Sequence, residues 1–129
     1  MAVRLGGPVF TKTEDPEEWA RAVRALGYRA ATCPVSPGAS DDTVRAFADA
    51  AGRHDVVISE VGAWSNPMSA DHAEAKAARA KCVAALELAE RIGASCAVNI
   101  AGSCGPVWDG PHPDNLTPAA FDRIVETTR

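Results

Sequence analysis

The sequence predicts a parallel α/β fold made of four consecutive strand–helix units. Short apolar runs alternate four times with longer amphipathic segments, and glycines or prolines separate the two kinds of segment. The 129 residues suffice for one ordinary domain with a single core. A hydrophobic fraction of 47% and a charged fraction of 23% are those of a globular protein.

The first unit begins with an expected strand around residues 3–5 and a turn at residues 6–8. Asp15 is a typical helix N-cap because its carboxylate can accept hydrogen bonds from free backbone N–H groups, and Pro16 suits the first helical position. We expect Gly27 to end this helix. The helix has an apolar stripe at the spacing that turns one face toward a core: Trp19, Ala22, Val23 and Leu26.

The second unit repeats this order, with an expected strand over residues 29–33 and a helix that begins after Ser40 and ends at Gly52. In the third unit, residues 56–61 are nearly all apolar, which suits a parallel strand covered on both faces. The helix expected over residues 69–92 is the longest. Its stripe consists of Cys82, Ala85, Leu86 and Ala89.

The fourth unit has an expected strand over residues 96–100 and a long loop rich in glycine and proline over residues 102–115. Thr117 and Pro118 are typical of a helix start, and Phe121, Ile124 and Val125 begin its stripe. This helix reaches Arg129 without a capping glycine or a following strand. We therefore expect residues 1–129 to be a single (βα)₄ unit truncated within its fourth helix.

Four strand–helix units fit two architectures. The N-terminal half of a (β/α)₈ TIM barrel places every helix on the outer side of the sheet. An open, flavodoxin-like doubly wound sheet places helices on both faces and binds ligands where the strand order reverses. The unfinished fourth helix favours the half barrel, whose exposed inner sheet face would associate with a partner or with a second copy of the chain.

Composition and charge exclude several classes of protein. The formal net charge of -4 gives no basic footprint for nucleic acid. No apolar run approaches the roughly 18 residues that cross a bilayer, and residues 1–4 lack the start of a signal peptide, so we expect a cytoplasmic protein without membrane contact. The four cysteines have no C-x-x-C pairing and are expected to be reduced and structural: Cys33, Cys82, Cys96 and Cys104.

Ligands of both architectures bind at the carboxyl ends of the strands, so the loops there hold the candidate site. Trp64 and Asn66 follow the third strand and combine an apolar wall with an amide, which is how a polyhydroxylated small molecule is held. In the alternative interpretation, Trp64 shields the end of the sheet and Asn66 caps the turn before Pro67.

Three further polar residues lie near strand ends. Asn99 is a polar residue in an apolar strand and needs hydrogen bonds from neighbours or from a ligand. His112 is the best placed of the three histidines, although a solvent-exposed loop histidine is the simpler interpretation. Glu60 is the carboxylate expected inside a strand. Facing inward it could bind substrate or metal, but we favour an outward orientation with a helix arginine as its partner, or a purely structural role. The glycines of the fourth loop do not form a known phosphate motif.

The third and fourth loops, together with the end of the third helix, resemble the sugar phosphate isomerase/epimerase family of the xylose isomerase-like TIM barrels. The similar stretches are EVGAWSNP at residues 60–67, LAERIGA at 88–94, VNIAGS at 98–103 and WDGPHPDNLT at 108–117.

This resemblance implies metal-dependent isomerisation or epimerisation of a carbohydrate or cyclitol, with a divalent metal (Mn, Mg, Co or Zn) in the full-length protein. In that family the metal ligands come mainly from later strands, so no metal or catalytic residue is expected in this chain, which alone would be inactive. Trp64, Asn66, Asn99 and His112 are expected to line the substrate pocket. The alternatives are a barrel similar to endonucleases that act at abasic DNA sites, and a non-enzymatic flavodoxin-like binding or signalling domain.

Overall fold

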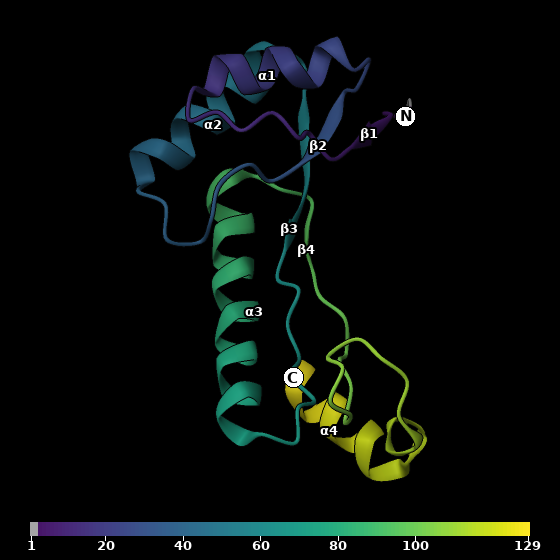
Figure 1. Ribbon diagram of the computed structural model, residues 1–129. Helices are drawn as coiled ribbons and strands as arrows, with labels where there is room; N and C mark the ends of the chain where they lie inside the picture. The colour runs from purple at the N-terminus through teal and green to yellow at the C-terminus, as the bar shows by residue number, and fades with distance from the viewer. Residues whose placement is uncertain (1–2) are drawn as a thin grey trace. The chain divides into compact units, whose positions relative to one another are not determined.

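The computed structural model describes residues 3–129 (Figure 1). Met1 and Ala2, on which the expectation about a signal peptide partly rests, lie outside the described residues. Strands and helices alternate along the chain, and a 3₁₀ helix precedes the last helix. The elements are β1 (Gly6–Gly7), α1 (Pro16–Ala25), β2 (Ala30–Thr32), α2 (Asp41–Arg53), β3 (Val57–Gly62), α3 (His72–Ile92), β4 (Cys96–Val98), η1 (Pro113–Leu116) and α4 (Pro118–Thr128).

The four strands form one sheet in the order β1-β2-β3-β4. Gly6 pairs with Ala30 and Ala31 pairs with Ile58, and both ladders are parallel. A doubly wound sheet requires a reversal in strand order, which this sequential order lacks among residues 3–129. The flavodoxin-like alternative is therefore wrong for the described chain, and the order is that of four successive barrel strands.

The chain divides into two compact units. Unit 1 comprises Met1–Gly62 and Ala85–Ala97, and unit 2 comprises Ala63–Ala84 and Val98–Arg129. Helix α3 and strand β4 thus contribute residues to both units. The prediction that residues 1–129 are one truncated (βα)₄ unit stays a prediction.

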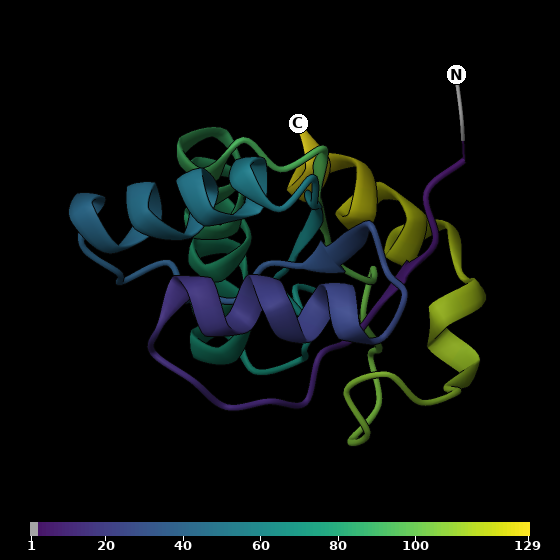
Figure 2. The ribbon, with the colours of Figure 1, turned by 90° about the horizontal axis from the view of Figure 1, so that it is seen from above.

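Unit 1 has an apolar core beneath two helices that lie side by side (Figure 2). Trp19 of α1 meets Phe47 of α2 edge to face, with ring centroids 5.7 Å apart. Asp15 and Ser40 cap the two helices as predicted, because each side chain accepts hydrogen bonds from backbone N–H groups of the first turn. Val23 and Ile58 complete the buried centre.

The first strand is Gly6–Gly7 rather than the predicted residues 3–5. Val3 and Leu5 are 99% and 68% exposed, whereas the glycines that were expected to turn form β1. A Cβ atom on Gly6 would lie 2.6 Å from the Ala30 carbonyl oxygen, so the close approach of β1 to β2 requires a glycine at this position.

Several predicted boundaries and stripe positions are wrong by small amounts. Helix α3 begins at His72 because Asp71 accepts hydrogen bonds from the N–H groups of Ala73 and Glu74. Gly52 lies inside the last turn of α2 rather than after it, and β4 ends at Val98. Three stripe residues are exposed: Leu26, Leu86 and Phe121.

All four cysteines are free, and Cys96 is exposed. Among residues 3–129, no helix combines the length and the apolar character needed to cross a lipid bilayer.

Candidate functional site

Asn66 joins the loop after β3 to the loop after β4 within unit 2. Its Nδ2 donates to the Ser103 carbonyl oxygen at 3.0 Å, and its Oδ1 accepts from the Ser103 N–H at 2.9 Å. The same Oδ1 accepts a hydrogen bond from the Met68 N–H at 3.2 Å. Asn66 is buried, so these bonds satisfy backbone groups that would otherwise lack partners.

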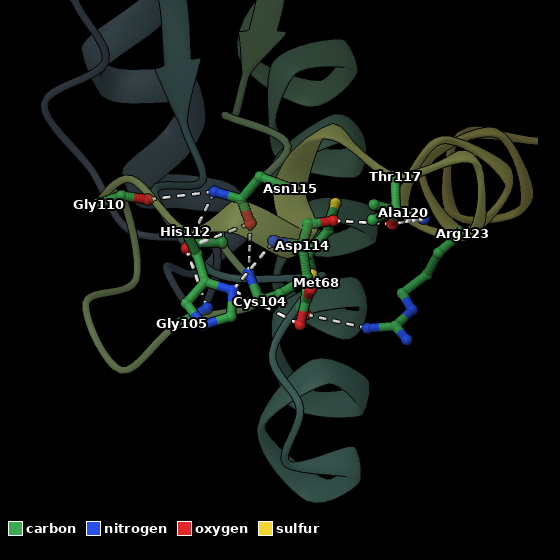
Figure 3. Close-up of polar contacts among 11 residues, drawn as sticks. Met68, Cys104, Gly105, Gly110, His112, Asp114, Asn115, Thr117, Ala120 and Arg123 are labelled. Carbon is green, nitrogen blue, oxygen red and sulfur yellow. Dashed lines mark hydrogen bonds and ion pairs between the residues drawn. The ribbon is translucent and has the colours of Figure 1, made fainter.

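Asn115 folds the loop of residues 102–115 on itself (Figure 3). Its Oδ1 accepts from the Cys104 N–H at 2.8 Å, and its Nδ2 donates to the Gly110 carbonyl at 3.2 Å. Buried Ser103 lies between the two asparagines, because its backbone binds Asn66 while its Oγ accepts from Asn115 Nδ2. Reasoning from the sequence did not single out Asn115, since nothing local distinguishes it from an ordinary residue before a helix.

Only a glycine can occupy position 102, next to the hydrogen bonds of Asn66. Its φ is +99°, a conformation that residues with a side chain rarely adopt. A Cβ atom at this position would also collide with Asn66 Oδ1. The loop can therefore approach Asn66 only with a glycine here.

Asn99 fixes the turn that presents Trp64. Its Oδ1 accepts from the Ser65 N–H at 2.9 Å, and its Nδ2 donates to the Cys82 sulfur at 3.2 Å. The Ser65 hydroxyl donates to the Ala78 carbonyl oxygen at 3.3 Å. These bonds tie the turn after β3 to helix α3.

Trp64 has backbone strain and an exposed ring. Its φ of 34° lies in the left-handed region, which is unfavourable for a residue with a bulky side chain, and its side chain is about half exposed. The carbonyl oxygen of Trp64 accepts a hydrogen bond from Lys81 Nζ at 3.1 Å. Strain of this kind often marks a functional position.

A hollow of about 420 Å³ lies beside Trp64, and we call it the tryptophan hollow. Its lining includes Trp64, Asn66, Glu74, Lys81 and Trp108. A smaller hollow of about 220 Å³ shares three of these residues, Asn66, Glu74 and Trp108. The Ser69 hydroxyl donates to Glu74 Oε2 at 2.6 Å, which orients that carboxylate at the start of α3.

His112 lies away from the tryptophan hollow. Its Nδ1 accepts a hydrogen bond from the Asp114 N–H at 3.3 Å, which caps η1. Its ring packs against Gly105, where an added Cβ atom would come within 2.9 Å of the imidazole (Figure 3). Of the four predicted pocket residues, the structure brings Trp64 and Asn66 to one hollow, and Asn99 supports their turn. Their role in binding substrate stays a prediction.

Glu60 does not have the helix arginine that we expected, because no ion pair involves it within residues 3–129. It pairs with Thr32 at an irregular step of the β2–β3 ladder. The regular alternation of side chains is broken at this step, because β3 advances by two residues from Ile58 to Glu60 while β2 advances by one from Ala31 to Thr32.

Titratable groups with displaced pKa values occur in unit 1. A hydrogen bond from His54 and then one from Arg53 lower the pKa of Glu17 below its ordinary value. Arg4 lowers the pKa of Asp55 in the same way, with help from the charge of Arg29. Burial raises the pKa of the Cys33 thiol.

The residues of this chain do not fit the divalent metal that the family resemblance implies. Within residues 3–129, no three histidine, cysteine, aspartate or glutamate side chains lie close enough together to hold a metal ion. The tryptophan hollow contains one carboxylate, Glu74, which is too few.

The fold is that of the N-terminal half of a TIM barrel. One similar solved structure is a protein from Rhodospirillum rubrum ATCC 11170 assigned as a xylose isomerase, with a TM-score of 0.68 and 15% identity. Another is the apo form of 3-keto-D-glucoside 4-epimerase from E. coli, with a TM-score of 0.65 and 11% identity.

The alignments cover 98% and 95% of this chain but 46% of each of those chains. At these identities the similarity establishes the fold alone, which confirms the half barrel predicted from the sequence. No protein-family model matches the sequence, and no curated protein is significantly similar to it.

Proposed function

We propose that this chain is the N-terminal portion of a sugar or cyclitol isomerase or epimerase. The fold supports this proposal, because the two similar structures are described as a xylose isomerase and a 3-keto-D-glucoside 4-epimerase. Active sites of TIM barrels lie at the carboxyl ends of the strands. The loops after β3 and β4, which form the tryptophan hollow, are in this position.

The observation that carries the proposal is the pair of exposed indoles in the tryptophan hollow. Trp64 is 51% exposed and Trp108 is 38% exposed, although burial of both rings would be favourable. An indole face suits the C–H face of a sugar ring, while Glu74 can accept and Lys81 can donate hydrogen bonds to hydroxyl groups.

In this proposal the described residues bind and orient the substrate. Asn66 and Asn115 hold the two loops in place, which fixes the positions of the residues that line the tryptophan hollow. The divalent metal would come from residues outside this chain, since no cluster of metal-binding side chains occurs among residues 3–129.

The test is an assay of the complete protein that contains this chain. A panel of aldoses, ketoses and cyclitols is incubated with the protein and Mn²⁺, and the products are identified by NMR. For a sugar that is converted, Trp108→Ala should raise KM roughly tenfold and change kcat less, because a stacking contact is lost before any chemistry.

Val107→Ala is the matched control, since Val107 is an exposed neighbour that does not line the tryptophan hollow. If no member of the panel is converted, or if Trp108→Ala behaves like Val107→Ala, the proposed function is wrong.

A further inference from the structure

A second hollow of unit 2 lies between the beginnings of α3 and α4, and its volume is about 520 Å³. We call it the arginine hollow. Helix α3 contributes His72, Ala75 and Arg79, which follow each other at the spacing of one helix face. Helix α4 contributes Ala120 and Arg123. Because Ala75 and Ala120 are small and buried, they leave open space between the two arginines.

The two guanidinium groups have no acidic partner. Within residues 3–129, no carboxylate oxygen lies within 4 Å of Arg79 or Arg123. Other arginines of the chain do have such partners, including Arg53 with Glu17 and Arg91 with Asp41. Two like charges that share a concave surface repel each other unless an anion lies between them.

Arg123 is held in position by the fold. Its Nη1 donates to the Met68 carbonyl oxygen at 3.2 Å (Figure 3), so the rest of the guanidinium fork stays available for a ligand. Planar guanidinium groups bind phosphate oxygens through paired, charge-assisted hydrogen bonds. The first turns of α3 and α4 also border the hollow and add partial positive charge.

Asp114 is the negative side chain that lines this hollow. Its carboxylate is mostly exposed and lies 3.8 Å from His112 Nδ1, a partner outside the hollow. It therefore reduces the positive potential without neutralising either arginine.

We propose that the arginine hollow binds the phosphate group of a phosphorylated small molecule. The proposal does not depend on the proposed function, because the tryptophan hollow and the arginine hollow are lined by different charged residues. It is tested by binding alone, without turnover.

The experiment is isothermal titration calorimetry of the complete protein with inorganic phosphate, glucose 6-phosphate, glucose and a short DNA duplex. We expect saturable binding of inorganic phosphate and of glucose 6-phosphate, whereas any heat from glucose should be the same in the unmodified protein and in Arg79→Ala. Arg79→Ala should weaken the binding of both phosphate ligands by about tenfold or more, because a charge-assisted pair is lost. Arg79 is exposed and its side chain forms no ion pair within residues 3–129, so we expect its truncation to leave the fold intact.

Two further variants keep the result interpretable. Lys76→Ala removes an exposed positive charge of the same helix that does not line the hollow, and it should leave phosphate binding unchanged. Asp114→Asn should strengthen phosphate binding by about twofold, because it removes an exposed negative charge that repels the negatively charged phosphate.

The proposal is overturned if inorganic phosphate does not bind saturably, or if Lys76→Ala weakens the binding of phosphate as much as Arg79→Ala does. Tighter binding of the DNA duplex than of glucose 6-phosphate, lost in Arg79→Ala, would also overturn it and would assign the hollow to nucleic acid.

Discussion

Unit 1 and unit 2 are stabilised by different kinds of contact. The core of unit 1 consists of apolar side chains from helices and strands, such as Trp19, Phe47 and Ile58. The three buried polar residues found within residues 3–129 all belong to unit 2: Asn66, Ser69 and Ser103. Unit 1 is therefore held mainly by apolar burial, whereas the loops of unit 2 are held by side-chain hydrogen bonds to the backbone.

This difference matters for function, because polar networks and apolar cores respond differently to substitution. Removal of an apolar side chain leaves a cavity whose cost follows the lost volume. Removal of one polar partner leaves backbone groups without hydrogen bonds and displaces the loop that they belong to. Substitutions in unit 2 should therefore change ligand binding more than substitutions in unit 1 of similar energetic cost.

The largest effect is expected for Phe47→Ala in unit 1. Phe47 is buried and packs edge to face on Trp19, so its truncation should lower the free energy of unfolding by about 3–5 kcal/mol. Urea denaturation followed by circular dichroism measures this loss. Phe10→Ala is the control. Because Phe10 is exposed, its truncation should lower the free energy of unfolding by less than about 0.5 kcal/mol. Equal costs at the two positions would contradict an apolar core at α1 and α2.

The second effect is expected for Asn66→Ala in unit 2. The variant leaves the N–H and carbonyl of Ser103 without partners, and we expect it to lower the free energy of unfolding by about 2–4 kcal/mol. It should also change the fluorescence of Trp108, which lines the same hollow. Asn115→Ala should act in the same direction because it frees the Cys104 N–H. A stable Asn66→Ala protein with unchanged fluorescence would show that the loop does not depend on this amide.

The third effect is expected for Gly102→Ala, which should lower the free energy of unfolding by about 1–3 kcal/mol. The φ of Gly102 is +99°, which disfavours a side chain, and the new Cβ atom would meet Asn66 Oδ1. The matched control in unit 1 is Gly52→Ala, which should raise the free energy of unfolding instead of lowering it. Gly52 is helical and has no atom within 4 Å of an added Cβ, so alanine should stabilise α2 by about 0.5–1 kcal/mol. Thermal unfolding of both variants checks the two signs together.

The sequence predicts unit 1 better than unit 2, for a physical reason. The helix starts of unit 1, at Asp15 and Ser40, depend on contacts two or three residues away, so local patterns reveal them. The positive φ of Gly27 also follows from its place after a helix.

The candidate site depends on distant contacts instead. Asn66 and Ser103 are 37 positions apart in the chain, and no local pattern shows that one will bind the backbone of the other. Trp64 and Asn66 were singled out because both follow a strand, but the bonds that orient them were not predictable. Trp108 was likewise missed as a wall of the hollow, since it lies within a long irregular loop.

The smallest effect is expected from pH, and it belongs to unit 1. The pKa of Glu17 is held below its ordinary value of 4.5 by His54 and Arg53, so the folded state binds a proton less readily than the unfolded state. Its contribution to stability is present above about pH 4.5 and is lost as the pH falls through the lower folded pKa. Glu17→Gln should therefore destabilise the protein at about pH 6 and lose that effect as the pH falls through the lowered pKa of Glu17, as urea denaturation at several pH values will show. Asp49→Asn, which removes an exposed carboxylate of α2 without an ion pair within residues 3–129, should show no such dependence. If the two variants respond alike, the ion pairs that join α1 to the end of α2 do not form in solution.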